Sequence, residues 1–321
     1  MNEPVIAQTV LQLANNNNKQ SPNTKRLLVY LGTATYDLPG PRQRQTQAFL
    51  QNKEHSQQEV TVESVDVAHG PLTDAGRALL DAADIILVSG GNTLYAVDRW
   101  KHVGLDIHLQ KAVVQRGAVV TGGSAGAICW FDGGHSDSAD PDSWKEAMMT
   151  TLVAAATNPQ EQQQHAQTDE SSAAPTSAAE TKAWEYIRIQ GLCFLPGLVC
   201  PHNDKIQSNG VLRATDFDQM LLRHNGEVGI GIDHWAALQV QGDVFTVVSI
   251  PDKEGSVLAN GEFSPDRQGK PGIWIKRVQN GRVVCRLCPS SGKLSDILSR
   301  ATEIVLDPRE EDCRQQNPAD F

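Results

Sequence analysis

The sequence predicts an α/β fold in which helices cover a parallel β-sheet. From Lys25 onward, short apolar runs typical of buried strands alternate with helix-like segments. The strand candidates are apolar on both faces, as expected when helices pack on each side of a parallel sheet. A length of 321 residues leaves room for one large domain of this kind.

Strands and helices follow one another regularly in the first half of the chain. Pro41 opens one predicted helix, and Thr73 is a candidate N-cap of the next. Strands are predicted at residues 25–34, 60–67 and 84–91 and from residue 118. Helices are predicted at residues 41–53, 73–82 and 94–117, the last with a break, and residues 125–131 resemble the start of another.

The second half of the chain begins with an interruption at residues 151–183. This segment is rich in Gln, Ala, Ser and Thr and offers few side chains that a core would bury, so we interpret it as a flexible insertion. After it come further strand-like runs, a helix candidate at 211–224 and a β-hairpin across Asn280-Gly281. The predicted organisation is a flexible leader at 1–24, one domain at 25–300 with a small C-terminal hairpin extension, and a loose tail at 301–321.

The composition argues against several classes of partner. The chain has 28 basic and 38 acidic residues, and its net charge of −10 disfavours nucleic acid and anionic membranes. No apolar run has the length of a membrane span, and the N-terminal residues lack the pattern of a secretory signal. The six cysteines are scattered, with one C-x-x-C pair at Cys285 and Cys288. We therefore expect a cytoplasmic protein.

A serine stands at the sharpest turn that the sequence predicts. Val120 ends a buried strand, and Gly122, Ser124 and Gly126 then form G-x-S-x-G before a helix-like run. In such an elbow the serine hydroxyl is exposed, and amides of the helix N-terminus point toward an anion that develops beside it. The alternative is an ordinary tight turn in which Ser124 is an N-cap.

Two other segments should lie on the same sheet edge as Ser124, because the carboxyl ends of parallel strands meet there. The turn SGGNT brings the amide of Gly91 to this edge, where it would form an oxyanion hole with the amide of Ala125. His202 follows another apolar run and is the candidate base, so activity should fall as the pH drops through a pKa of about 6–7. The alternatives are a structural glycine turn and a surface histidine.

The segments SGGNT, GGSAGA, LPGLVCPH and GIGID, in this order, resemble the peptidase E family of α-aspartyl dipeptidases and its cyanophycinase-like relatives. The resemblance covers roughly residues 25–249 without the insertion. It implies a three-layer αβα sandwich with a mostly parallel, flavodoxin-like sheet, related to class I glutamine amidotransferases. It also implies that a serine nucleophile hydrolyses peptide bonds with no metal or other cofactor.

The resemblance assigns roles to individual residues. Ser124 matches the nucleophile, His202 matches the base, and Gly91 and Ala125 match the oxyanion hole. Asp137 falls where the dipeptidases place an aspartate that shapes the active site.

The resemblance also implies an arginine that binds an acidic side chain of the substrate. Arg213 follows the base at a plausible interval, and a guanidinium group suits a carboxylate well. Asn92 and His135 are further candidates for contact with the substrate. The alternatives are a solvated helix arginine and an exposed loop histidine.

The third member of the triad departs from the family. The dipeptidases carry a glutamate in the turn after a strand like GIGID, where this chain has His234 beside Asp233. A histidine does not supply the carboxylate that a Ser-His-acid triad uses. We expect Asp233 to replace it and keep Asp137 as the alternative. If both Asp233 and Asp137 lie far from His202 and His234 alone occupies that place, the non-catalytic alternative with a decayed triad is favoured over the enzyme.

The predicted function is that of a serine peptidase acting on small peptides, with dipeptides that begin with Asp as the candidate substrate. An alternative of another class is a non-catalytic, amidotransferase-like binding module. An α/β-hydrolase esterase ranks third, because it places the acid between Ser and His in chain order. The sequence leaves the oligomeric state open.

Overall fold

The computed structural model describes residues 3–17, 25–51, 59–150, 183–318 and 320. The insertion predicted at 151–183 therefore lies outside the described residues, except for Ala183. Within the described part of the chain, no helix has the length and apolar character needed to cross a membrane.

The predicted parallel sheet is present in the first half of the chain. In the described residues it has four strands in the order β2–β1–β3–β4, and every neighbouring pair is parallel. The strands are β1 (Lys25–Leu31), β2 (Glu59–Ser64), β3 (Ile85–Val88) and β4 (Val119–Gly122).

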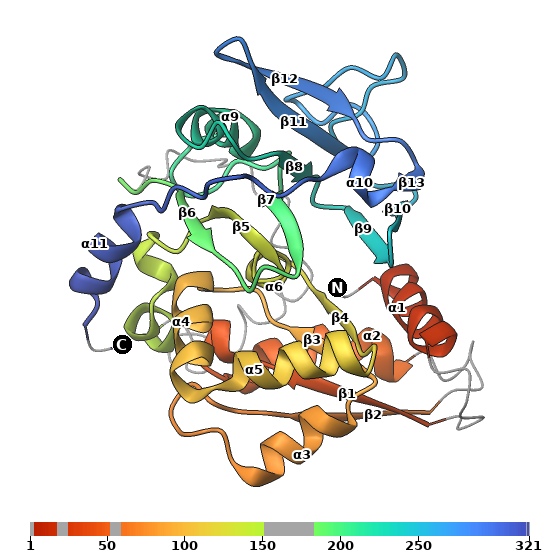
Figure 1. The fold of residues 1–321 in the computed structure, drawn as a ribbon, viewed down its shortest axis with the longest axis vertical. Coiled ribbons are helices and arrows are strands. Elements are labelled where there is room, and N and C mark those ends of the chain that lie inside the picture. The colour runs from red at the N-terminus through yellow and green to blue at the C-terminus, as the bar shows by residue number, and fades with distance from the viewer. Residues whose placement is uncertain (1–2, 18–24, 52–58, 151–182, 319, 321) are drawn as a thin grey trace, which may run out of the picture.

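Helices cover both faces of this sheet, as Figure 1 shows. Alternate residues of a strand point to opposite faces, so Leu28 and Tyr30 pack with one pair of helices while Val29 and Leu31 pack with the other group. The first pair is α1 (Pro4–Asn17) and α2 (Pro39–Gln51). The second group is α3 (Asp74–Ala82), α4 (Thr93–Val103) and α5 (Leu105–Gln110), which continues into the π-helical turn η3 (Lys111–Gln115).

The later strands form a second sheet instead of extending the first. In the described residues its order is β12–β11–β8–β7–β5–β6, with β5, β7 and β8 parallel and the outer pairs antiparallel. Its strands are β5 (Phe131–Ser136), β6 (Ile187–Gln190), β7 (Leu195–Pro201), β8 (Gly229–Ile232), β11 (Ile273–Gln279) and β12 (Arg282–Leu287). Helix α9 (Arg213–Arg223) packs against this sheet through β7, β11 and β12.

A short helix separates the last strand of the first sheet from the first strand of the second. The helix predicted from residue 125 is only α6 (Ala125–Ile128), and the chain then enters β5, in a stretch that the sequence suggested would be a loop. Sheet β13–β10–β9 is antiparallel and separate, with β9 (Ala236–Gln241), β10 (Val244–Ser249) and β13 (Ser291–Lys293). The fold is thus α/β with a parallel central sheet and additional sheets.

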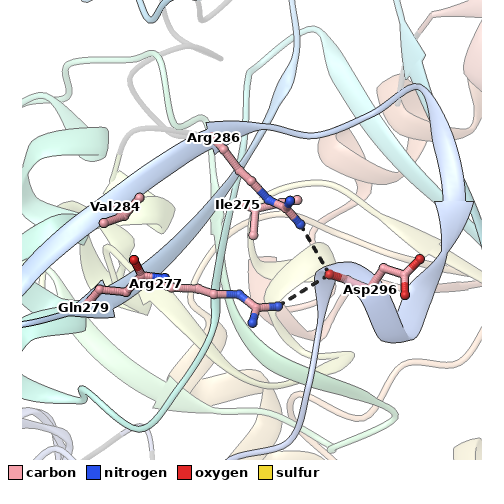
Figure 2. A pocket seen from close by; sticks show the side chains of 6 residues that line it. All are labelled: Ile275, Arg277, Gln279, Val284, Arg286 and Asp296. Carbon is pink, nitrogen blue, oxygen red and sulfur yellow. Dashed lines mark hydrogen bonds between the residues drawn. The ribbon is translucent and has the colours of Figure 1, made fainter.

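The predicted C-terminal hairpin is present as β11 and β12. Asn280 and Gly281 form its turn with φ values of 51° and 73°, the left-handed conformation that an Asn-Gly hairpin turn requires. A pocket of about 240 Å³ lies on this hairpin. In it Arg277 and Arg286 both donate to the backbone oxygen of Asp296 in α10 (Leu294–Ile297), which ties the hairpin to that helix (Figure 2).

The N-terminal segment differs from the predicted flexible leader. Helix α1 buries Ala7, Val10, Leu11 and Ala14, whose spacing places them on one helical face. Its C-terminal end is held by Asn17, which donates to the carbonyl oxygen of Gly117 and accepts a hydrogen bond from Gln241 on β9.

The C-terminal segment also differs from the predicted loose tail, because it contains α11 (Arg309–Gln316). The carboxylates of Asp307 and Glu310 accept hydrogen bonds from the backbone amides of Arg188 and Gln190 on β6. Arg314 pairs with Asp98 on α4. The tail thus connects the second sheet to a helix of the first, along the left of Figure 1.

Candidate active site

Ser124 has the strained backbone of an elbow between β4 and α6. Its φ of 54° and ψ of −120° lie outside the regions that non-glycine residues usually adopt. Glycine is required on both sides: a Cβ on Gly122 would lie 2.5 Å from the carbonyl oxygen of Gly126, and one on Gly126 would lie 2.4 Å from that of Val88. The serine hydroxyl caps no amide of the helix, which leaves it available for another role.

The predicted glycine turn lies beside this serine. Val88 pairs with Gly122, so β3 and β4 end at the same edge, and a Cβ on Gly90 would lie 3.4 Å from the Cβ of Ser124. Gly91 has a φ of 118°, and a Cβ there would lie 2.1 Å from the carbonyl oxygen of Ala34. Among the described residues, neither the amide of Gly91 nor that of Ala125 donates to a protein acceptor.

A pair of histidines stands at the ends of β7 and β8. Pro201 pairs with Ile232, so His202 and His234 follow neighbouring parallel strands. Their Nδ1 atoms are 2.7 Å apart, so one nitrogen donates its proton to the other. Asp204 accepts a hydrogen bond from the backbone amide of His234 and fixes the turn that carries it. The His234 ring also meets the ring of Trp235 edge-on, with the centroids 4.5 Å apart.

The expectation that Asp233 orients His202 is not met by the structure. Asp233 is buried, and its Oδ2 accepts hydrogen bonds from the amide and hydroxyl of Ser256 and from the amide of Gly272 at 2.7–3.0 Å. These contacts turn the carboxylate toward the 256–272 segment. Among the described residues, no carboxylate is hydrogen-bonded to His202, and His234 occupies the place of the acid.

Asp137, Arg213 and His135 form a separate buried cluster. Arg213 is fully buried at the start of α9, and its Nη1 donates to Asp137 at 3.2 Å and to Gln207 at 2.8 Å. Its Nη2 donates to the carbonyl oxygen of His135, whose ring Nε2 is 2.9 Å from Asp216. A buried guanidinium needs such partners, so the expected contact of Arg213 with a substrate carboxylate is already replaced by an internal one.

Asn92 also has a structural place. It is fully buried and caps α4, because its Oδ1 accepts a hydrogen bond from the amide of Tyr95. Its Nδ2 donates to Ser143. Neither Asn92 nor the Asp137 cluster lines the cavity that contains Ser124.

A cavity of about 510 Å³ brings Ser124, His202 and His234 together. This volume is within the range of small-molecule sites, roughly 300–1,000 Å³. Besides the elbow and the histidine turn, its walls come from α1, β4, β9, β10 and the loop before β7. The wall formed by α1 was not predicted from the sequence, although the helical spacing of apolar residues 6–14 was a signal for it.

The electrostatics of the histidine pair favours neutral rings. Burial, with smaller contributions from Arg213 and Lys205, lowers the pKa of His202 to about 3. Burial and the neighbouring His202 also lower the pKa of His234. A neutral His202 keeps a nitrogen lone pair, which a general base requires.

These shifts change the pH dependence expected of the site. Because the pKa of His202 is lowered, its ring stays neutral well below the ordinary titration range of a histidine. If His202 is the general base, we expect kcat/KM for a neutral peptide substrate to show no acid limb due to His202 between about pH 8 and about pH 5. Burial and the neighbouring Asp204 raise the pKa of Asp233, which also lines the cavity, to about 6, so the profile is measured in Asp233→Asn as well as in the wild type. A profile that halves near pH 6.5 in both proteins would contradict this environment of His202.

Fold and site together define an α/β protein that presents a serine elbow and a histidine in one cavity. The model of peptidase family S51 matches residues 18–182, and the chain belongs to this family. The predicted relationship to peptidase E-like proteins is thereby confirmed.

Three individual proteins are similar to this chain. A peptidase from an acI-B1 Actinobacterium has a similar fold, with a TM-score of 0.54 and 16% identity over 91% of this chain and 92% of that one. A Bacillus subtilis (strain 168) protein named uncharacterized peptidase YgaJ is 52% identical over 58 residues, which are 18% of this chain and 25% of that protein. A Trypanosoma brucei brucei protein named G2/mitotic-specific cyclin-1 is 29% identical over 302 residues, 91% of this chain and 81% of that protein.

Proposed function

We propose that the protein is a serine peptidase in which Ser124 is the nucleophile and His202 is the general base. The observation that carries this proposal is that the strained elbow serine and the histidine pair line one cavity. In the first step the Ser124 Oγ attacks the scissile carbonyl carbon, and His202 takes the hydroxyl proton and later gives it to the leaving amine. The amides of Gly91 and Ala125 would stabilise the oxyanion.

His234 can fix the tautomer of His202, which is one of the two roles of the missing acid. If His202 donates its Nδ1 proton to the Nδ1 lone pair of His234, the Nε2 of His202 is left with a lone pair for the serine proton. This is the tautomer that an aspartate or glutamate fixes in a Ser-His-acid triad. A neutral imidazole does not, however, stabilise the positive charge that His202 acquires during the reaction. We therefore infer a working but slow base.

This assignment makes His234→Glu an informative variant. A carboxylate at this position would keep the tautomer and add the missing negative charge, so we expect kcat to rise by about tenfold or more, part of the roughly 10⁴-fold that an orienting acid contributes. His234→Gln is the matched neutral control and should give no gain. If steady-state kinetics gives the same kcat for His234→Glu and His234→Gln, His234 does not occupy the position of the triad acid.

A non-catalytic binding module is the second candidate. The absence of a carboxylate at His202 among the described residues is the outcome that favours it by the criterion drawn from the sequence. The peptidase is placed first because the chain belongs to peptidase family S51 and His234 can fix the same tautomer of His202. A fluorophosphonate probe separates the two functions, because only an activated serine displaces fluoride from phosphorus. Labelling of the wild type that is lost in Ser124→Ala supports the peptidase. An unlabelled wild type supports the binding module.

The preference for dipeptides that begin with Asp finds no support at Arg213. Its guanidinium is already paired with Asp137 and lies outside the cavity lining. We propose small peptides as the class of substrate.

A further inference from the structure

The cavity around Ser124 has a mostly apolar lining. Among the described residues that line it there is no lysine and no arginine. Apolar side chains come from every wall: Ile6 and Leu13 from α1, Trp130 and Phe194 from around β5 and β7, and Leu238 and Val240 from β9.

The acidic groups of the lining are also engaged elsewhere. Asp233 is bound to Ser256 and Gly272, and Glu3 pairs with Lys253 at 3.9 Å. The histidine pair is neutral because of its lowered pKa values. A charged side chain of a substrate would therefore lose its hydration without gaining a counter-ion, which is unfavourable. An apolar side chain would gain free energy by leaving water.

Helix α1 forms one wall of this cavity and presents two apolar faces. Ala7, Leu11 and Ala14 are buried against the sheet, whereas Ile6 and Leu13 are only partly buried and line the cavity. The contacts of Glu3 with Lys253 and of Asn17 with Gly117 and Gln241 hold the two ends of the helix. The wall is thus a positioned element of the site.

We propose that this cavity is a specificity pocket for a large apolar side chain next to the scissile bond, and that α1 sets its size. The proposal rests on the proposed function, because it places this pocket beside a nucleophilic Ser124. It replaces the expected preference for acidic substrates with one for peptides that carry residues such as Leu or Phe.

The test compares how fast alkyl fluorophosphonates of two lengths inactivate the full-length protein. Attack by the Ser124 Oγ forms an O–P bond as the P–F bond breaks and fluoride leaves. We expect the octyl probe to react at least about tenfold faster than the ethyl probe, since one methylene in an apolar pocket can change specificity by about tenfold or more. Leucine and phenylalanine amides should likewise be cleaved with at least about tenfold higher kcat/KM than the matched aspartate amide.

Variants of α1 tie the preference to this wall. Ile6→Trp and Leu13→Trp should fill the cavity and bring the octyl-to-ethyl ratio close to one, while the ethyl probe still reacts. Val5→Trp is the matched control, because Val5 is on the same helix, is exposed and does not line the cavity. It should leave the ratio unchanged.

The outcomes separate the two proposals. If the ethyl probe labels Ser124 and the octyl probe reacts no faster, or if the aspartate amide is preferred, the apolar pocket is wrong and the peptidase stands. If the octyl probe is still preferred in both tryptophan variants, α1 does not set the size of the pocket. If no probe labels Ser124, the assignment of Ser124 as the nucleophile is wrong, and the proposed function is contradicted.

Discussion

Ser124→Ala should lower the hydrolysis of peptides by at least about a thousandfold and leave the protein folded. Loss of the nucleophile removes the covalent step, and in serine proteases only the catalysis due to binding and the oxyanion hole then remains. The fold should persist because the Ser124 hydroxyl caps no helix amide and alanine has the small side chain that the glycine-flanked elbow accepts. Single-turnover kinetics on purified protein gives the rate.

The control for this prediction is Ser299→Ala, which removes an exposed hydroxyl outside the cavity. Both variants should show the circular dichroism spectrum and melting temperature of the wild type. Near-normal turnover in Ser124→Ala would end the assignment of Ser124 as nucleophile. A large fall in melting temperature would show instead that the hydroxyl has a structural role.

The largest effect on stability is expected from Glu227→Ala. Glu227 accepts two hydrogen bonds of 2.8 Å from the guanidinium of Arg188, and both side chains are almost completely buried. Removing one partner of a buried pair leaves an uncompensated charge and costs about 3–5 kcal/mol. The melting temperature should fall by on the order of 10 °C.

A double variant tests the cause of this loss. Arg188→Met combined with Glu227→Leu replaces the pair by apolar side chains, which is often neutral in buried sites. We expect it to recover most of the stability lost in Glu227→Ala. A double variant less stable than Glu227→Ala would show that the Arg188 side chain contributes through contacts other than this ion pair.

The fold could be predicted where local patterns determine it. The strands around Leu28 and Ile86 are buried on both faces, and this pattern identifies a parallel sheet without knowledge of its partners. The second sheet was missed because β5 has the sequence FDGGHS, which lacks such a pattern. Its glycines are required by distant neighbours: a Cβ on Gly133 would lie 3.0 Å from the Arg188 guanidinium, and one on Gly134 would lie 2.6 Å from the carbonyl oxygen of Val199.

In the candidate site, too, the features set by nearby residues could be predicted and those set by distant residues could not. Ser124 and His202 stand out because their signals lie within a few residues of each. The position of the Asp233 carboxylate depends on Ser256 and Gly272, which come from a later segment, so the sequence placed the residue correctly at a strand end but not its side chain. The internal contact of Arg213 was not predicted for a similar reason, since its partner Asp137 is 76 residues away in the sequence.

The carboxylates of Asp307 and Glu310 have a consequence for the outer edge of β6. Among the described residues this strand is the last of its sheet, and the backbone donors of an unprotected edge are a template on which a strand from another molecule can add. Here the donors of Arg188 and Gln190 are already occupied by side chains of the same chain, and these side chains are acidic. The docked tail therefore protects the molecule against edge-to-edge aggregation, and resistance to intermolecular β-pairing at this edge depends on the contacts that hold α11 in place.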